Sequence, residues 1–242
     1  MPVPSLVELR RYRMRPGGRD ALIDLFDREL VESQEACGMR ILGQFRDLDD
    51  ADAFVWMRAF DDLKARTAAL AGFYGGPVWA EHRPAAVATM LNSENALLLE
   101  PLAPDEGFGA RTGPRPPAGE TAAAPGLYLA ATCSLAPGAA AGFAAAFASA
   151  RGAIERAGAR IEATMIRKEA ANGFPRLPLR EGETLFIWIA SFPDEPARRA
   201  WQAALAADAD WTGRLWPDLD RRMWRRMEVA RLRPTTRSAM RR

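Results

Sequence analysis

Apolar and polar positions alternate in the segment from Leu6 to Met14, the first regular pattern of the chain. A period of two residues indicates a β-strand with two different faces. From Arg19 to Ala36 the apolar positions recur with helical spacing instead, and Gly38 follows. Glycine favours the left-handed conformation that often ends a helix. The chain is therefore predicted to begin as strand, turn and helix.

By the same periodicity rules, roughly the next 60 residues form two strands, a helix and a final strand. Strands are predicted at Met39–Arg46 and Phe54–Phe60, and a fourth at Asn95–Glu100. Asp61 or Asp62 can cap the helix that lies between the last two of these strands, because a carboxylate accepts from the free N–H groups at the start of a helix. The order β-α-β-β-α-β is that of a ferredoxin-like unit.

The second half of the chain repeats this order. Strands are predicted at Leu127–Leu135, Arg160–Lys168, Thr184–Phe192 and Met227–Arg233, with helices at Ala139–Ala157 and after Asp194. The run Phe54-Val55-Trp56 recurs as Phe186-Ile187-Trp188. A repeat of this length indicates two similar units that pack on one another. The fold class is therefore α+β, with two tandem ferredoxin-like (βαββαβ) domains.

Composition divides the chain into four parts. Residues 1–101 and 127–234 are expected to be the two domains, and residues 102–126, rich in Pro, Gly and Ala, the linker between them. Residues 235–242 are basic and are expected to form a mobile tail.

Charge and cysteine content exclude several classes of protein. The formal net charge is only +2, so no global field favours nucleic acid. No apolar run reaches the roughly 20 residues of a membrane span. Cys37 and Cys133, one in each half, form neither a metal motif nor a disulfide framework. We expect a cytoplasmic protein without membrane or nucleic-acid partners. The formation of a homo-oligomer stays an open alternative.

Several motifs of the first half together resemble the NIPSNAP family. They occur in the order Glu8-Leu9-Arg10-Arg11-Tyr12, Pro16-Gly17, Gly43-Gln44-Phe45, Phe54 to Phe60, Phe73-Tyr74-Gly75-Gly76-Pro77-Val78-Trp79, His82-Arg83 and Thr89-Met90. In the second half only the Phe-x-Trp strand and the Pro-Gly turn stand out. The resemblance implies a dimeric α/β-barrel fold, here pseudo-dimeric, in which two ferredoxin-like sheets close face to face. It implies little about chemistry.

Strand alternation groups the polar side chains of the first half. Glu8, Arg10 and Tyr12 share one face of their strand, and Trp56 and Arg58 share one face of theirs. The opposite faces are aliphatic and suit packing on helices. We therefore expect the polar and aromatic faces to point between the two sheets and to line a ligand cavity. Glu8 should pair with Arg10 or Arg58, because an unpaired buried charge is costly.

The second half lacks this charged set. With the repeats aligned, Glu8, Arg10, Tyr12 and Arg58 correspond to Leu129, Ala131, Cys133 and Ala190, whereas Trp56 corresponds to Trp188. Trp188 is therefore predicted to bind a ligand on an apolar wall, opposite the polar groups of the first half. The alternative is a buried charge network that only fixes the packing of the sheet.

His82 is the only histidine, so any histidine chemistry would have to use it. If the protein is an enzyme, we expect His82, Arg58 and Tyr12 to be catalytic, with Glu8, Arg10, Trp56, Trp188 and Arg83 binding the ligand. The alternative is a structural histidine bonded to a backbone carbonyl. One histidine makes a multi-histidine metal site improbable, and we predict no metal and no cofactor.

Two functions remain after these observations. The first is binding of a small, partly aromatic or apolar molecule between the sheets, extending to cofactor-independent chemistry in the first half. The second is a non-catalytic interaction or scaffold protein that acts through its outer surface. An open cavity favours the first, and an interior filled by side chains favours the second.

Overall fold

The computed structural model describes residues 4–109 and 115–241 of the chain. Its first half contains the elements β1 Leu6–Met14, α1 Gly18–Leu25, η1 Phe26–Leu30, α2 Val31–Ala36, β2 Arg40–Asp47, β3 Ala53–Phe60, α3 Leu63–Tyr74, α4 Pro77–Thr89, β4 Met90–Asn92 and β5 Ala96–Pro101. The element η1 is a π-helical segment that joins α1 and α2 into one continuous helical stretch. Asp62 caps α3, as predicted, by accepting from the Ala65 backbone N–H at 2.7 Å.

The second half contains the elements β6 Leu127–Leu135, α5 Ala140–Arg156, β7 Arg160–Arg167, β8 Thr184–Phe192, α6 Glu195–Ala207, the π-helical η2 Trp211–Leu215, α7 Trp216–Asp220 and β9 Glu228–Pro234. Asp194 caps α6 by accepting from the Ala197 backbone N–H at 2.8 Å. The predicted strands of this half and both of its predicted helices are therefore confirmed in type. The helical segments after α6 were not predicted.

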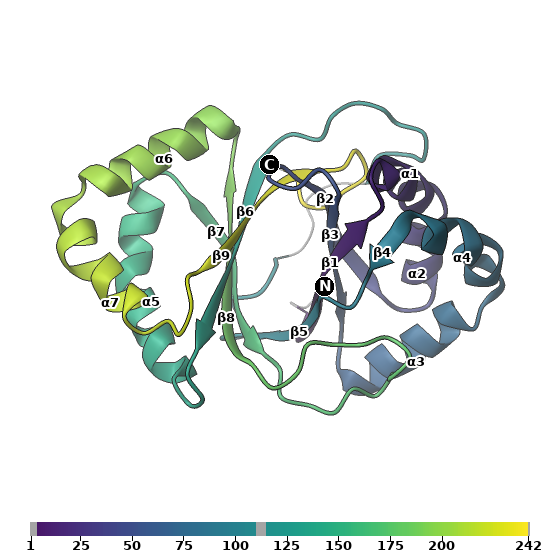
Figure 1. Cartoon of the computed structure of the whole chain (residues 1–242), viewed down its shortest axis with the longest axis horizontal. Helices are drawn as coiled ribbons and strands as arrows, with labels where there is room; N and C mark the ends of the chain where they lie inside the picture. Colours follow the sequence, from purple (N-terminus) through teal and green to yellow (C-terminus); the bar gives the residue numbers. More distant parts are fainter. Residues whose placement is uncertain (1–3, 110–114, 242) are drawn as a thin grey trace.

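Eight strands close into one antiparallel barrel. The sheet order is β3-β2-β9-β6-β8-β7-β5-β1, and β1 pairs back with β3, while β4 pairs with the end of β1. The halves meet at two seams, β2 with β9 and β5 with β7. Helices of the first half cover one side of the barrel and those of the second half the other (Figure 1). The predicted packing of the halves sheet to sheet within one chain is confirmed.

Apolar side chains form three cores, one inside the barrel and one under each helical layer. The barrel core is aliphatic in the main and includes Val55, Met57, Leu99, Met165 and Ile187. The core under the first helical layer includes Tyr12, Phe26, Phe54, Trp56 and Phe73. The core under the second layer includes Phe143, Phe147, Phe186, Trp188 and Trp201.

The predicted orientation of the first-half strands is therefore wrong. Val55 and Met57 point into the barrel, whereas Trp56 and Tyr12 lie under the helices. Every residue of β3 is buried, so both faces of the strand are covered and polarity alone does not distinguish them. The narrow interior of an eight-stranded barrel accepts aliphatic side chains, and the large aromatic and arginine side chains occupy the wider space between sheet and helices.

The C-terminal segment is not a free tail. Thr235 and Ser238 are fully buried, and Arg237 is 5% exposed. Arg237 donates to the carbonyl of Pro116 at 2.8 Å and forms an ion pair with Glu32. The expectation of a mobile tail is wrong because these side chains hydrogen-bond to the first half and to the segment between the halves.

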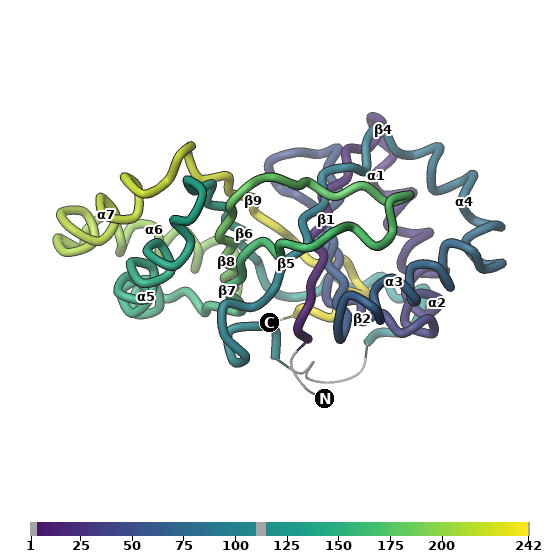
Figure 2. The backbone as a smooth tube through the Cα atoms, turned by 90° about the horizontal axis from the view of Figure 1, so that it is seen from below, coloured from purple at the N-terminus to yellow at the C-terminus, as the bar shows by residue number. Residues whose placement is uncertain are grey.

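A long loop of residues 168–183 joins β7 and β8 and crosses from the second half to the first (Figure 2). Phe174 stacks on Tyr74 of α3 with ring centroids 5.8 Å apart. The Arg180 backbone N–H donates to the carbonyl of Ala96 at 2.8 Å. This loop therefore covers part of the first half. Within the described residues, no helix has the length and apolar character needed to cross a membrane.

Candidate functional site

Glu8 lies at the centre of a buried arginine cluster, which we define as Glu8, Arg10, Arg58 and Arg66. All four residues are 0% exposed. The Glu8 Oε2 atom accepts from Arg58 Nε at 2.8 Å and from Arg10 Nη1 at 3.1 Å, and its Oε1 accepts from Arg66 Nε at 2.6 Å. The predicted pairing of Glu8 with Arg10 and Arg58 is confirmed. Arg66, from α3, was not predicted.

The arginines keep Glu8 ionised. Burial alone would raise the pKa of Glu8, but the charges of Arg58, Arg10 and Arg66, with the Arg66 hydrogen bond, outweigh it and lower the pKa to about 2. Three guanidinium groups share this single carboxylate, so the cluster carries a net charge of +2. Burial also raises the pKa of the Tyr12 hydroxyl, which accepts from Arg10 Nε at 3.1 Å.

Aromatic rings surround the cluster. The Arg58 guanidinium lies 4.9 Å from the Trp56 ring centroid and 5.8 Å from that of Tyr74. Arg58 Nη1 also donates to Gln34 Oε1 of α2 at 3.0 Å. Tyr12 meets the Trp56 ring edge-on at 5.8 Å. The expected residues Glu8, Arg10, Tyr12, Trp56 and Arg58 are thus brought together, beneath the helices and not between the sheets.

His82 and Arg83 lie apart from this cluster on α4. The His82 Nε2 atom is 3.7 Å from Glu29 Oε2 of η1, and Arg83 is exposed. Neither residue lines either of the two cavities described below. The structure therefore does not assemble His82 and Arg83 with Arg58 and Tyr12 into one site.

The second half has a cavity between its sheet and its helices, the layer in which the arginine cluster lies in the first half. On the paired strands, Glu8 lies opposite Arg58 and Leu129 lies opposite Ala190. Likewise Arg10 lies opposite Trp56, and Ala131 opposite Trp188. The strand pair of the second half thus has apolar side chains and no charged ones at these places, and Leu129 and Trp188 line the cavity.

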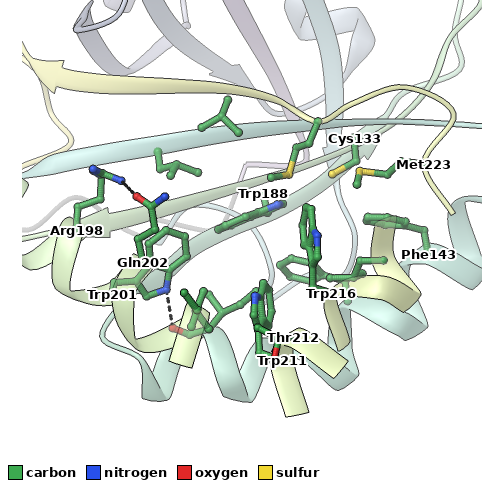
Figure 3. A pocket seen from close by; sticks show the side chains of 18 residues that line it. Cys133, Phe143, Trp188, Arg198, Trp201, Gln202, Trp211, Thr212, Trp216 and Met223 are labelled. Carbon is green, nitrogen blue, oxygen red and sulfur yellow. Dashed lines mark hydrogen bonds between the residues drawn. The ribbon is translucent and has the colours of Figure 1, made fainter. Parts of the chain in front are cut away.

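This cavity, the helix-side cavity, has a volume of about 450 Å³. Tryptophans from several elements line it: Trp188 from β8, Trp201 from α6, and Trp211 and Trp216 from η2 and α7 (Figure 3). The rings of Trp211 and Trp216 stack with centroids 6.0 Å apart. The rest of the lining is largely aliphatic or aromatic, with Phe143 among the labelled residues. The cavity can therefore enclose a flat apolar molecule.

Few polar groups face the helix-side cavity. Arg198 and Gln202 lie at one end, where Arg198 Nη1 donates to Gln202 Oε1 at 3.0 Å (Figure 3). Arg198 also donates to Glu195, a carboxylate that Arg199 and Arg231 share. Burial raises the pKa of the Cys133 thiol to about 12, so this lining residue stays protonated at neutral pH. The lining thus offers a few hydrogen-bond donors, and Cys133 is not a thiolate there.

A second cavity of about 330 Å³ opens between the sheets at one end of the barrel. Its apolar lining includes Leu9, Val55 and Leu97 from the barrel core. Arg11 and Asp47 also line it and pair with each other at 3.0 Å. The space between the sheets is therefore partly open, but the arginine cluster does not face it.

No pattern in the sequence directly indicates the helix-side cavity. Trp201, Trp211 and Trp216 belong to helical segments that were not assigned to a site. The available signal was the absence of the charged set from the second half, where Leu129, Ala131 and Ala190 align with Glu8, Arg10 and Arg58. The absence of charged groups predicts an apolar layer, provided that the sequence identifies which side of the sheet these residues face.

Comparison with known proteins supports the family resemblance in the first half. The NIPSNAP family model matches residues 7–103. A NIPSNAP domain protein from Burkholderia xenovorans is 24% identical, with 40% of this chain and 95% of that chain covered, at a TM-score of 0.38. No curated protein matches the chain.

Two solved structures share the fold over nearly the whole chain. An anthrone oxidase-like protein is 13% identical with a TM-score of 0.62, covering 96% of this chain and 91% of that chain. A candidate monooxygenase from Lactobacillus acidophilus NCFM is 10% identical with a TM-score of 0.57, covering 96% of this chain and 94% of that chain. At these identities the likeness shows the fold alone: an α/β barrel of the kind found in monooxygenase-like proteins.

Proposed function

We propose that this chain, whose residues 7–103 are a NIPSNAP domain, binds a small, flat, apolar or aromatic molecule in the helix-side cavity of its second half. The observation that carries the proposal is the cavity of about 450 Å³ lined by Trp188, Trp201, Trp211 and Trp216. Ligand sites commonly have volumes of roughly 300–1,000 Å³ and mostly apolar linings with a few polar groups. Gln202 and Arg198 would orient a carbonyl or hydroxyl group of such a molecule.

The difference between the two halves, in the layer between sheet and helices, supports this proposal. We propose that they are tandem ferredoxin-like repeats, of which the first has the charged arginine cluster between its sheet and its helices and the second has the apolar cavity there. A β-bulge interrupts β2 between Ile41 and Gly43, and another interrupts β7 between Ile161 and Ala163. These bulges lie opposite Arg58 and Ala190, at matching places in the two halves. Bulges tend to be kept within families.

One fold neighbour suits this class of ligand: it is described as anthrone oxidase-like, and anthrone is a flat aromatic ketone. We also propose a cytoplasmic location, which the free thiols of Cys37 and Cys133 suit. The proposal concerns binding, and whether the bound molecule reacts depends on its own chemistry together with the few polar groups of the lining.

Anthrone is a suitable probe for a direct test. We expect it to raise the thermal unfolding midpoint of the wild-type protein in a saturable manner, because it binds only the folded state. Trp188→Leu should weaken its affinity by about tenfold, since stacking contacts and buried area are lost. Trp224→Leu is the matched control because Trp224 is 69% exposed and does not line the cavity.

Two results would count against the proposal. One is an unchanged midpoint at all anthrone, naphthol and steroid concentrations tested, which would favour a scaffold that acts through its surface. The other is an equal loss of affinity in the Trp188 and Trp224 variants, which would place the ligand outside the cavity.

A further inference from the structure

The arginine cluster of the first half holds more positive charge than its surroundings neutralise. Arg10, Arg58 and Arg66 are fully buried, and within the described part of the chain Glu8 is the only carboxylate in ion-pair distance of them. A buried guanidinium cannot relieve its charge by losing a proton. Leaving a buried charge without a partner costs several kcal/mol in general. The cluster therefore has the charge balance of a site that lacks an anion.

Three buried donors in this region have no hydrogen-bond acceptor among the described residues: the Nη2 groups of Arg58 and Arg66 and the indole Nε1 of Trp56. The Arg58 Nη2 group is still in ion-pair distance of Glu8 Oε2, at 2.7 Å, whereas no such contact is made by Arg66 Nη2 within the described residues. Arg66 is 0% exposed and Trp56 is 2% exposed. Buried polar groups are nearly always hydrogen-bonded, and exceptions point to a missing water, ion or ligand. Guanidinium groups bind carboxylate and phosphate oxygens with particular strength.

We infer that the arginine cluster is a binding site for a compact oxyanion, either a carboxylate or a phosphate. The Nη2 group of Arg66 donates to the anion, while Glu8 holds the three guanidinium groups in place. The indole N–H of Trp56, whose ring lies 4.9 Å from the Arg58 guanidinium, supplies a further donor on that side. This site lies in the opposite half from the helix-side cavity, so it stands independently of the proposed function.

The loop of residues 168–183 forms the wall through which the anion enters. Arg66 Nη1 donates to Asn172 Oδ1 at 3.2 Å, so the loop reaches the cluster directly. Figure 2 shows this loop extending from the second half across the first. It contains no helix or strand, and such segments open more readily than the sheet beneath them.

Arg214 provides the control for the change of charge. It is an exposed residue of η2, and its Nε and Nη2 groups donate to Asp210 Oδ1 and Oδ2, each at 2.7 Å. It lines neither of the two cavities. Arg214→Gln therefore removes one positive charge, as Arg66→Gln does, but outside the arginine cluster.

The test is thermal unfolding at pH 7 with increasing sodium acetate or sodium phosphate, at an ionic strength kept constant with sodium chloride. We expect a saturable rise of the unfolding midpoint, about 3–6 °C at ten times the Kd, in the wild-type protein and in Arg214→Gln. Arg66→Gln should abolish it. Response to acetate alone identifies a carboxylate site, and response to phosphate alone a phosphate site. Equal responses in all three proteins, or none in the wild type, would overturn the inference.

A second measurement avoids the need for a folded Arg66 variant. Crystals of the unmodified protein can be soaked in sodium selenate, an oxyanion with an anomalous signal. An anomalous peak within hydrogen-bonding distance of Arg66 Nη2 is expected. Peaks only at exposed arginines, with none at the cluster, would contradict the site.

Discussion

At the scale of residues, Glu8 distinguishes the first half from the second, because it organises a buried cluster of charged side chains. A single carboxylate holds three arginines that come from two strands and a helix. In the second half Leu129, which lies opposite Ala190, forms part of a cavity lining instead. Charged residues thus occupy the layer between sheet and helices in the first half, and a mainly apolar cavity lies in that layer of the second half. Residue identity, more than backbone course, decides what each half can bind.

The ionisation of Glu8 should make the protein sensitive to acid. The folded-state pKa of Glu8 is lowered from 4.5 to about 2, so its contribution to stability is complete above pH 4.5 and is lost as the pH falls toward 2. The shift corresponds to on the order of 3 kcal/mol. Urea unfolding at a series of pH values should show this decline in the wild-type protein. In Glu8→Gln stability should already be low at pH 7, and its decline with acid should be smaller.

Glu81→Gln serves as the control, because Glu81 is an exposed residue of α4. It should keep both the stability and the acid profile of the wild type. Identical acid profiles in Glu8→Gln and the wild-type protein would show that the cluster does not hold Glu8 ionised.

Sequence reasoning located the members of the cluster but placed them on the wrong side of the sheet. Alternation correctly put Glu8, Arg10 and Tyr12 on one face. It could not tell which face meets the helices, because both faces of β3 are buried. Arg66 was missed since it comes from a helix rich in alanine, where no pattern separates a buried arginine from a solvated one.

At the scale of elements, strands were predicted more accurately than helices. Strands β1, β6 and β8 begin and end at the predicted residues. For the segment of α4 the sequence allows either an irregular stretch or a helix, since Pro84 lies inside it, and β4 is too short to show a period. The π-helical segments η1 and η2 also escape prediction, since their apolar spacing resembles that of an α-helix.

The C-terminal segment should act as a structural element. Ending the chain after Pro234 removes the buried Thr235 and Ser238 and leaves the backbone N–H of Gln44 without its Ser238 partner. We expect a loss of about 2–3 kcal/mol in unfolding free energy, from two or three lost hydrogen bonds. Thermal denaturation followed by circular dichroism measures it.

Arg233→Ala is the control for this truncation, because Arg233 is exposed and the substitution removes one positive charge without removing the segment. It should unfold at the wild-type midpoint. A truncated protein that also keeps that midpoint would show that the segment only rests on the surface.

At the scale of the whole molecule, each half supplies the strands and apolar surface that the other half needs to close the barrel. The edge strands β2 and β5 of the first half pair with β9 and β7 of the second, which closes the barrel. Val55 and Met57 are buried against residues such as Ile187 and Met165 of the opposite sheet. The loop of residues 168–183 adds a third connection. Neither sheet is covered on both faces without the other half.

An isolated first half, residues 1–101, should therefore not be a stable monomer. It would expose two unpaired strand edges and the aliphatic face of its sheet, which favours pairing between copies. Size-exclusion chromatography with light scattering should find dimers or larger species. A folded monomer with native-like thermal stability would mean that the barrel seams contribute little.

Ligand binding in the helix-side cavity is tested most directly by isothermal titration calorimetry with anthrone. Ala206, on α6, is exposed and lines the cavity, whereas Ala203 on the same helix is exposed and does not. Ala206→Trp should weaken anthrone binding at least tenfold by obstructing the cavity, while Ala203→Trp should bind like the wild type. Equal affinity in all three proteins, or no binding in the wild type, would contradict the account.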